Sequence, residues 1–148
     1  MLHTRSCFFV SALAFCVFAL TGCGSSQKGA TLKGTVVLPS NVKLAENDSA
    51  TVGFAPDGTE GQSFVAAINP ADLSFVTKGP AGKGILPGKY KITVNFQPYI
   101  PGESKQKAIF EDVNARYNAQ NSRLSYEVTA DSQQSITIDL SKGTVTKQ

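Results

Sequence analysis

The stretch GKYKITVNF, residues 88–96, decides the fold, because apolar and polar side chains alternate along it without a break. Successive side chains of an extended strand point to opposite faces. Alternation with a period of two is therefore typical of a β-strand that buries one face and exposes the other. A Pro-Gly turn signal at residues 87–88 marks the start of this strand. The face that we predict to lie in the core carries Tyr90, Ile92, Val94 and Phe96.

Six further segments with strand-like character lie on either side of this strand. Their approximate bounds are residues 32–38, 52–54, 64–68, 73–77, 124–128 and 136–140. Most of them have one apolar face, and the predicted core residues there include Tyr126 and Ile138. Two antiparallel sheets packed face to face bury all such faces at once. We therefore expect an all-β fold, a seven-stranded antiparallel β-sandwich of Greek-key type.

A long connection at residues 97–123 separates the fifth and sixth predicted strands. Connections of this length are usually functional or cross from one sheet to the other. No segment of the chain shows sustained helical periodicity, and the best candidate is a short amphipathic turn at residues 109–117. Its apolar residues are Ile109, Phe110, Val113 and Tyr117. We expect this second half of the connection to cover an open sheet edge, in preference to forming a binding loop.

The amino terminus predicts an export signal at residues 1–22. Arg5 precedes an apolar stretch at residues 7–20, which fits the core of a signal peptide and is short for a membrane-spanning helix. The motif that ends this region is Leu20-Thr21-Gly22-Cys23. It resembles the bacterial lipobox, which implies cleavage before Cys23, a diacylglycerol on its sulfur and an acyl chain such as palmitate on its new amine. The alternative is an ordinary signal peptide that leaves Cys23 as a free thiol.

The rest of the chain divides into three predicted parts. Residues 23–29 are the lipidated cysteine and a flexible tether, because they contain no large apolar residue. Residues 30–142 form the β-sandwich, and residues 143–148 form a C-terminal tail. In the usual sorting rule for bacterial lipoproteins, Asp after the cysteine retains the protein at the inner membrane, and this chain has Gly24 there. We therefore expect an exported, lipid-anchored protein at the outer membrane rather than the inner one.

Composition excludes several chemistries from the part after residue 22. It has no His, no Trp, no Met and one Cys, so neither a Ser-His-Asp nor a Cys-His arrangement exists there. The same composition excludes a His-ligated or multi-Cys metal site, and we expect neither an enzyme nor a cofactor. Asp48, Asp57 and Glu60 are acids in predicted loops, and solvated turn residues are favoured over a calcium site. Basic residues are scattered rather than clustered, which argues against nucleic acid as a partner.

The run at residues 72–94 carries a family resemblance. An aspartate turn at Asp72, a short strand with Phe75 and the sequence Pro87-Gly88-Lys89-Tyr90 are similar to the centre of a carboxypeptidase regulatory-like domain. That family has a transthyretin-like (prealbumin-like) β-sandwich, and the resemblance implies no catalytic residues. The closing stretch at residues 121–142 is similar to the end of many small bacterial lipoproteins built from this domain. The chain departs from the family at Leu73, where glycine is usual, and in an insertion at residues 79–84.

These observations lead to two hypotheses for function. The first is a lipid-anchored cell-envelope protein whose β-sandwich serves as a structural or interaction module, with the membrane and an envelope protein or glycan as partners. The alternative is a carbohydrate- or ligand-binding module on the cell surface. Sugar-binding surfaces usually expose aromatic platforms, and the aromatic residues available for one are Tyr99 and Tyr117.

Overall fold

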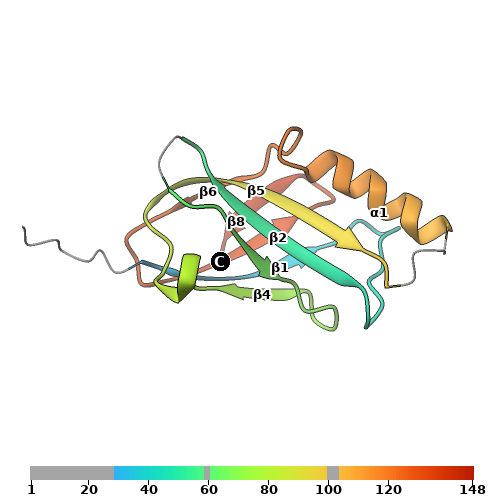
Figure 1. The fold of residues 1–148 in the computed structure, drawn as a ribbon, viewed down its shortest axis with the longest axis horizontal. Coiled ribbons are helices and arrows are strands. Elements are labelled where there is room, and N and C mark those ends of the chain that lie inside the picture. The colour runs from blue at the N-terminus through green and yellow to red at the C-terminus, as the bar shows by residue number, and fades with distance from the viewer. Residues whose placement is uncertain (1–28, 59–60, 100–103) are drawn as a thin grey trace, which may run out of the picture.

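The structure, a computed structural model, describes residues 29–58, 61–99 and 104–148. Within these residues, eight β-strands form two four-stranded sheets that pack face to face, with one α-helix beside them (Figure 1). The strands are β1 (Thr31–Val37), β2 (Ser49–Pro56), β3 (Phe64–Ala67), β4 (Ser74–Thr77), β5 (Gly88–Gln97), β6 (Ser125–Val128), β7 (Gln133–Asp139) and β8 (Thr144–Lys147). The helix is α1 (Ser104–Tyr117), and a short 3-10 helix, η1 (Pro80–Gly82), lies between β4 and β5. The prediction of a two-sheet β-sandwich is confirmed.

The two sheets differ in strand direction. One sheet has the order β3-β2-β5-β6 and is antiparallel throughout. The other has the order β4-β1-β7-β8, and its central strands β1 and β7 run parallel, with Thr31 opposite Gln133. The prediction of seven strands, all antiparallel, is therefore wrong in number and in direction. Because β1 and β7 come from opposite ends of the domain, no short turn between them imposes an antiparallel pairing.

The eighth strand, β8, lies in the stretch that the sequence indicated as a tail. It pairs with β7, so that Val145 stands opposite Ile138. The chain reverses at Gly143, whose φ of 67° falls in the region that glycine tolerates best. The backbone N–H of Gln148 donates to the Ser135 carbonyl at 2.8 Å and ties down the last residue. Val145 is the single apolar side chain in β8, so this strand carries no alternation that sequence analysis could detect.

The core lies between the two sheets and is rich in aromatic rings. Phe54 stacks on Phe64 with ring centroids 5.0 Å apart, and the Tyr90 ring meets Phe64 edge-on at 5.8 Å. The predicted core face of β5 points inward, since its four residues are all buried: Tyr90, Ile92, Val94 and Phe96. Ile138 on β7 is also buried, whereas Tyr126 on β6 is half-buried. The Tyr126 hydroxyl donates to the side-chain oxygen of the buried Gln134 at 3.0 Å, which links β6 of one sheet to β7 of the other.

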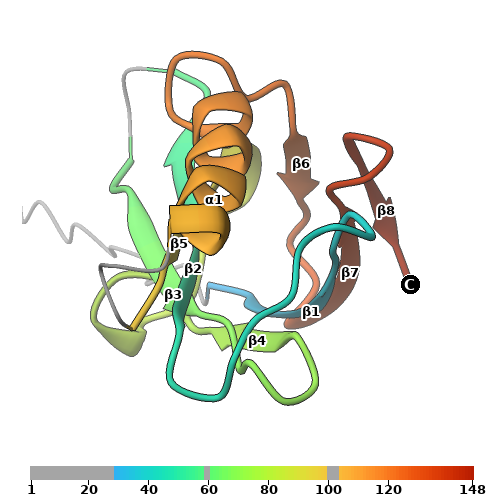
Figure 2. The same ribbon diagram turned by 90° about the vertical axis from the view of Figure 1, so that its right-hand side faces the viewer.

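The helix α1 covers the edge of β5 that β6 leaves open. β6 pairs with only the first residues of β5, from Gly88 to Lys91. Beyond that point α1 lies beside β5 (Figure 2), and the Phe110 ring packs on Phe96 with centroids 5.5 Å apart. The expected absence of sustained helix is therefore wrong, while the expected covering of a sheet edge is confirmed. The sequence pattern does not indicate this helix, because only Phe110 and Val113 are buried apolar residues and the first turns are polar.

The strands run along the long axis of the molecule and give it two ends (Figure 1). At what we term the proximal end, the chain enters β1 beside the connections between β2 and β3 and between β4 and β5. At the opposite, distal end, α1 begins and β5 ends. Among the described residues, no helix has the length and apolar character needed to cross a bilayer.

Candidate functional site

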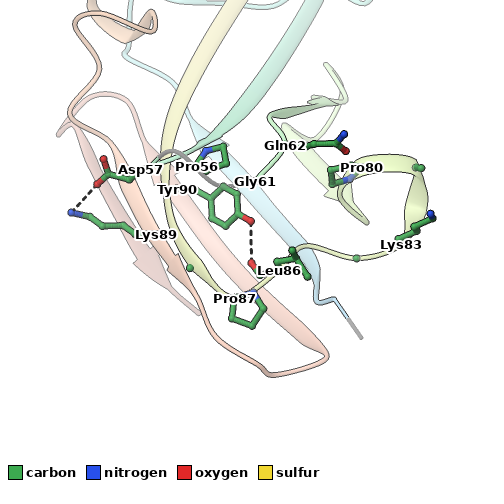
Figure 3. A pocket seen from close by; sticks show the side chains of 14 residues that line it. Pro56, Asp57, Gly61, Gln62, Pro80, Lys83, Leu86, Pro87, Lys89 and Tyr90 are labelled. Atoms are coloured by element: carbon green, nitrogen blue, oxygen red, sulfur yellow. Dashed lines mark hydrogen bonds and ion pairs between the residues drawn. The ribbon is translucent and has the colours of Figure 1, made fainter. Parts of the chain in front are cut away.

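A cavity of about 800 Å³ opens at the proximal end (Figure 3). It lies between the β2–β3 connection and the loop at residues 78–88 that joins β4 to β5. Its lining includes three prolines, Pro56, Pro80 and Pro87, together with Gln62, Lys83, Leu86, Lys89 and Tyr90. The volume falls within the range of about 300–1,000 Å³ that is usual for small-molecule sites. This cavity, which we call the proximal pocket, is the candidate functional site.

Tyr90 forms the inner wall of the proximal pocket. Its residue is 6% exposed, and its hydroxyl donates to the Leu86 carbonyl at 3.0 Å (Figure 3). Burial raises the pKa of the Tyr90 hydroxyl, so the group stays protonated at neutral pH and keeps this hydrogen bond. The ring therefore offers an apolar wall rather than an open aromatic platform, and Leu86 is held in place at the rim, where it is 48% exposed.

Close backbone contacts fix the rim of the pocket to the start of the domain. Ala30 and Ile85 exchange two backbone hydrogen bonds, each 2.8 Å long. Next to this bridge, Gly29 and Gly84 approach so closely that a Cβ on either residue would overlap the backbone of the other. Gly84 also has a φ of 93°, which an L side chain rarely adopts. The residue at which the described chain begins is therefore packed directly against a residue that lines the pocket.

Charge at the pocket is mostly positive and lies on its rim. Lys89 forms an ion pair with Asp57 at 3.3 Å, and both side chains are more than half exposed (Figure 3). Exposed pairs of this kind contribute about 0–1 kcal/mol to stability. Lys83 is exposed on the opposite rim, in the same loop as the exposed Lys78. Neither lysine belongs to a recognisable motif: residues 79–84 stand out in the sequence only as an insertion, although residues 78–89 contain three lysines and no acid.

The two tyrosines considered for ligand binding do not come together. Tyr99 is 69% exposed at the distal end, just after β5. Tyr117 is half-buried at the opposite end of α1, and its hydroxyl donates to the Leu140 carbonyl at 2.5 Å. Tyr99 lies beside Asp48, which also binds Gln106 in the first half of α1, so the helix from Gln106 to Tyr117, roughly 16 Å long at 1.5 Å per residue, separates the two tyrosines. They therefore form no common platform, and neither lines the proximal pocket.

The acids considered for calcium are engaged with donors in the structure. The carboxylate of Asp48, buried at the distal end, accepts hydrogen bonds from the Ala45 N–H (2.8 Å), the Tyr99 N–H (3.0 Å) and the Gln106 side-chain amide (2.6 Å). It thereby joins the β1–β2 connection, the end of β5 and α1. Asp57 pairs with Lys89, and Glu60 lies outside the described residues. In the described part of the chain, no three His, Cys, Asp or Glu side chains group as metal ligands would.

The residues of the predicted lipidation site, Leu20, Thr21, Gly22 and Cys23, also lie outside the described residues. No family model, curated protein or solved structure matches this chain. The residues of the candidate site form an open pocket with apolar walls and a lysine-bearing rim, at the end where the chain enters the sandwich.

Proposed function

We propose that this chain is a lipid-anchored cell-envelope protein whose single β-sandwich acts as a structural or interaction module. The observation that carries the proposal is the motif Leu20-Thr21-Gly22-Cys23 at the end of an apolar stretch of signal-peptide length. Seven residues later the folded domain begins, at Ala30. Two or more acyl chains at Cys23 would hold such a domain stably at a membrane, because each buried methylene contributes about 0.8 kcal/mol.

The proposal includes membership of the carboxypeptidase regulatory-like, transthyretin-like domains with their Greek-key topology. The two-sheet architecture supports it, as does one detail of the β3–β4 turn. Leu73 has a φ of 58°, a left-handed conformation that costs most residues about 1–2 kcal/mol. It occupies the position at which the resembled family usually has glycine. A protein of this kind has no catalytic role of its own, and we propose none here.

A ligand-binding module is the second candidate, favoured by the proximal pocket. The pocket has apolar walls from Pro56, Pro80 and Tyr90, and polar side chains from Gln62 and Lys83 at its rim. Such a lining suits a ligand with an apolar body and a hydrogen-bonding or anionic group. Chemical-shift changes confined to pocket residues when envelope glycan fragments are added would favour this function. Changes around Tyr99 instead would point to the distal end.

Lipidation at Cys23 is tested by the intact mass of protein extracted from bacterial membranes. We expect a chain that starts at Cys23 and carries a diacylglycerol and an amide-linked acyl group. Cys23→Ala should abolish both modifications and release the chain from the membrane fraction. The matched control is Cys16→Ala, which removes another cysteine from the predicted signal and should leave the mass of the mature protein unchanged. An unmodified wild-type chain in the soluble fraction would overturn the proposal.

A further inference from the structure

The loop that forms the rim of the proximal pocket combines positive charge with exposed apolar surface. Residues 78–89, KGPAGKGILPGK, contain three lysines and no acid. Lys78 and Lys83 are exposed, and Leu86 between them and β5 is 48% exposed although it is one of the larger apolar side chains. Surfaces that bind lipid headgroups combine these two features, since lysines attract phosphates and apolar side chains enter the interface.

Two of the three lysines of this loop form no ion pair with a described acid. Among the described residues, Lys89 pairs with Asp57 and Lys147 pairs with Asp131, while Lys78 and Lys83 form no ion pair. The remaining described acid near this end, Glu127, stands opposite Lys89 in the β5–β6 register. Lys89 therefore faces both Asp57 and Glu127, while no described acid pairs with Lys78 or Lys83, so the uncompensated positive charge of the loop is that of these two lysines.

The length of the preceding chain limits how far this loop can be from the proposed anchor. Cys23 precedes Gly29 by six residues, which span at most about 20 Å when fully extended. Gly29 is packed on Gly84, within the loop. If Cys23 is acylated, the loop therefore lies within about 20 Å of the bilayer interface at all times. Exposed charges act over about 8 Å at physiological salt, so short excursions toward the membrane bring Lys78 and Lys83 into contact with its phosphates.

We propose that the loop at residues 78–89 docks on the headgroup layer of the membrane that holds the lipid anchor. Lys78 and Lys83 bind lipid phosphates, Leu86 enters the interface between headgroups, and the proximal pocket faces the bilayer. The distal end, with Tyr99 and Asp48, then points away from the membrane. This inference rests on the proposed function, because the anchor supplies the high local concentration that makes two lysines and a leucine sufficient.

The experiment uses the full-length, lipidated protein in vesicles of phosphatidylethanolamine and phosphatidylglycerol that also carry a headgroup-attached quencher. Acylated Cys23 does not react with thiol reagents, so a single engineered cysteine accepts a fluorescent label. Leu86→Cys places the label on the loop, and Tyr99→Cys is the matched control, since both replace exposed apolar residues at opposite ends. We expect several-fold stronger quenching at position 86 than at position 99. Equal quenching at both positions, or stronger quenching at 99, would overturn the proposed orientation.

The lysines are tested in the same assay with a double variant, Lys78→Gln with Lys83→Gln. We expect this variant to lose most of the quenching at position 86, and we expect high salt to cause a similar loss in the protein with both lysines. The control variant, Lys33→Gln with Lys43→Gln, should keep the quenching. Both control lysines are exposed and lie outside the loop. Unchanged quenching in the Lys78/Lys83 variant would show that its charges do not hold the loop on phosphates and would overturn that part of the proposal. Flotation of the unlabelled protein with vesicles measures the anchor separately: a chain that does not float refutes the proposed function, whereas a chain that floats with position 86 unquenched refutes only this inference.

Discussion

The two halves of β5 are closed by different means. Along its first half, from Gly88 to Lys91, the outer edge is paired with β6 in a regular antiparallel ladder. At Ile92 the edge is still bonded by the stretch before β6, since the Ile92 N–H donates to the Leu124 carbonyl at 2.9 Å. Beyond it α1 takes the place of a strand, and the side chain of Asn114 supplies two hydrogen bonds to the backbone of Phe96. The Phe96 N–H donates to the Asn114 Oδ1 at 2.8 Å, and the Asn114 Nδ2 donates to the Phe96 carbonyl at 2.9 Å.

The comparison shows how an open sheet edge can be satisfied without a ninth strand. Buried backbone groups need hydrogen-bond partners, and an unpaired edge invites association with other chains. A β-ladder meets this need through several hydrogen bonds between backbone groups, so no single side chain is essential for them. The helix meets it through one side chain and two buried apolar contacts, Phe110 and Val113. We therefore expect single substitutions on α1 to weaken the helix-covered half of β5 strongly. In the half paired with β6 (the ladder half), the loss of stability should come mainly from substitutions of core side chains.

The largest effect is expected in the ladder half, at Tyr90. Tyr90→Ala removes a buried ring that contacts Phe64 and breaks the hydroxyl bond to the Leu86 carbonyl. We expect a loss of about 3–5 kcal/mol in the free energy of unfolding, which urea melts measure directly. The matched controls lie on the outer face of the same strand: Lys89→Ala, with a change of about 0.5 kcal/mol or less, and Lys91→Ala, with a change of about 1 kcal/mol because its Nζ donates to the Ala119 carbonyl at 2.6 Å. A loss in Lys91→Ala as large as in Tyr90→Ala would contradict the assignment of the core face.

A smaller but more local effect is expected in the helix-covered half, at Asn114. Asn114→Ala leaves both backbone groups of Phe96 without their partner. Each unsatisfied buried group costs about 1–3 kcal/mol, and water entering the edge offsets part of this, so we expect a total of about 1–3 kcal/mol. Hydrogen exchange should accelerate at the Phe96 amide while amides at Gly88–Lys91 stay protected. Arg116→Ala, which removes an exposed pair with Asp112 on the same helix, should change stability by about 0.5 kcal/mol or less. Uniformly faster exchange along β5 would show that the two halves are not independent.

The same contrast explains what could be predicted from the sequence and what could not. The alternation from Tyr90 to Phe96 reports burial of one strand face, so the strand and its core face follow from the residues alone. The residues that bond the open edge of a strand produce no comparable sequence pattern. Asn114 is one polar residue in a polar helix, so nothing in the sequence distinguishes it as the partner of Phe96. The parallel pairing of β1 with β7 and the addition of β8 likewise depend on which edges remain free after folding. The proximal pocket lies between two separate loops, the β2–β3 connection and the β4–β5 loop, and neither loop contains a motif that predicts it.

The smallest expected effect concerns the end of α1, at Tyr117, where the helix is attached to the other sheet. The Tyr117 hydroxyl donates to the Leu140 carbonyl just after β7, and burial raises the pKa of this hydroxyl above its ordinary value of about 10. A group whose pKa is higher in the folded state stabilises that state below the unfolded pKa and loses this contribution as pH rises through the folded pKa. Stability should therefore fall above about pH 10.

Tyr117→Phe separates the hydrogen bond from the ring. It keeps the apolar contact and removes the donor, so we expect a loss of about 0.5–1.5 kcal/mol at neutral pH. Above about pH 10 the difference between variant and wild type should shrink, since the wild type then loses the same bond by ionisation. Urea melts at neutral and alkaline pH measure both quantities. Burial also raises the pKa of Tyr90 and of Tyr126, so these two groups give an alkaline loss of stability that is common to both proteins. A difference close to zero at both neutral and alkaline pH would show that Tyr117 holds the helix through its ring alone, and the end of α1 would then be closed by packing rather than by a hydrogen bond.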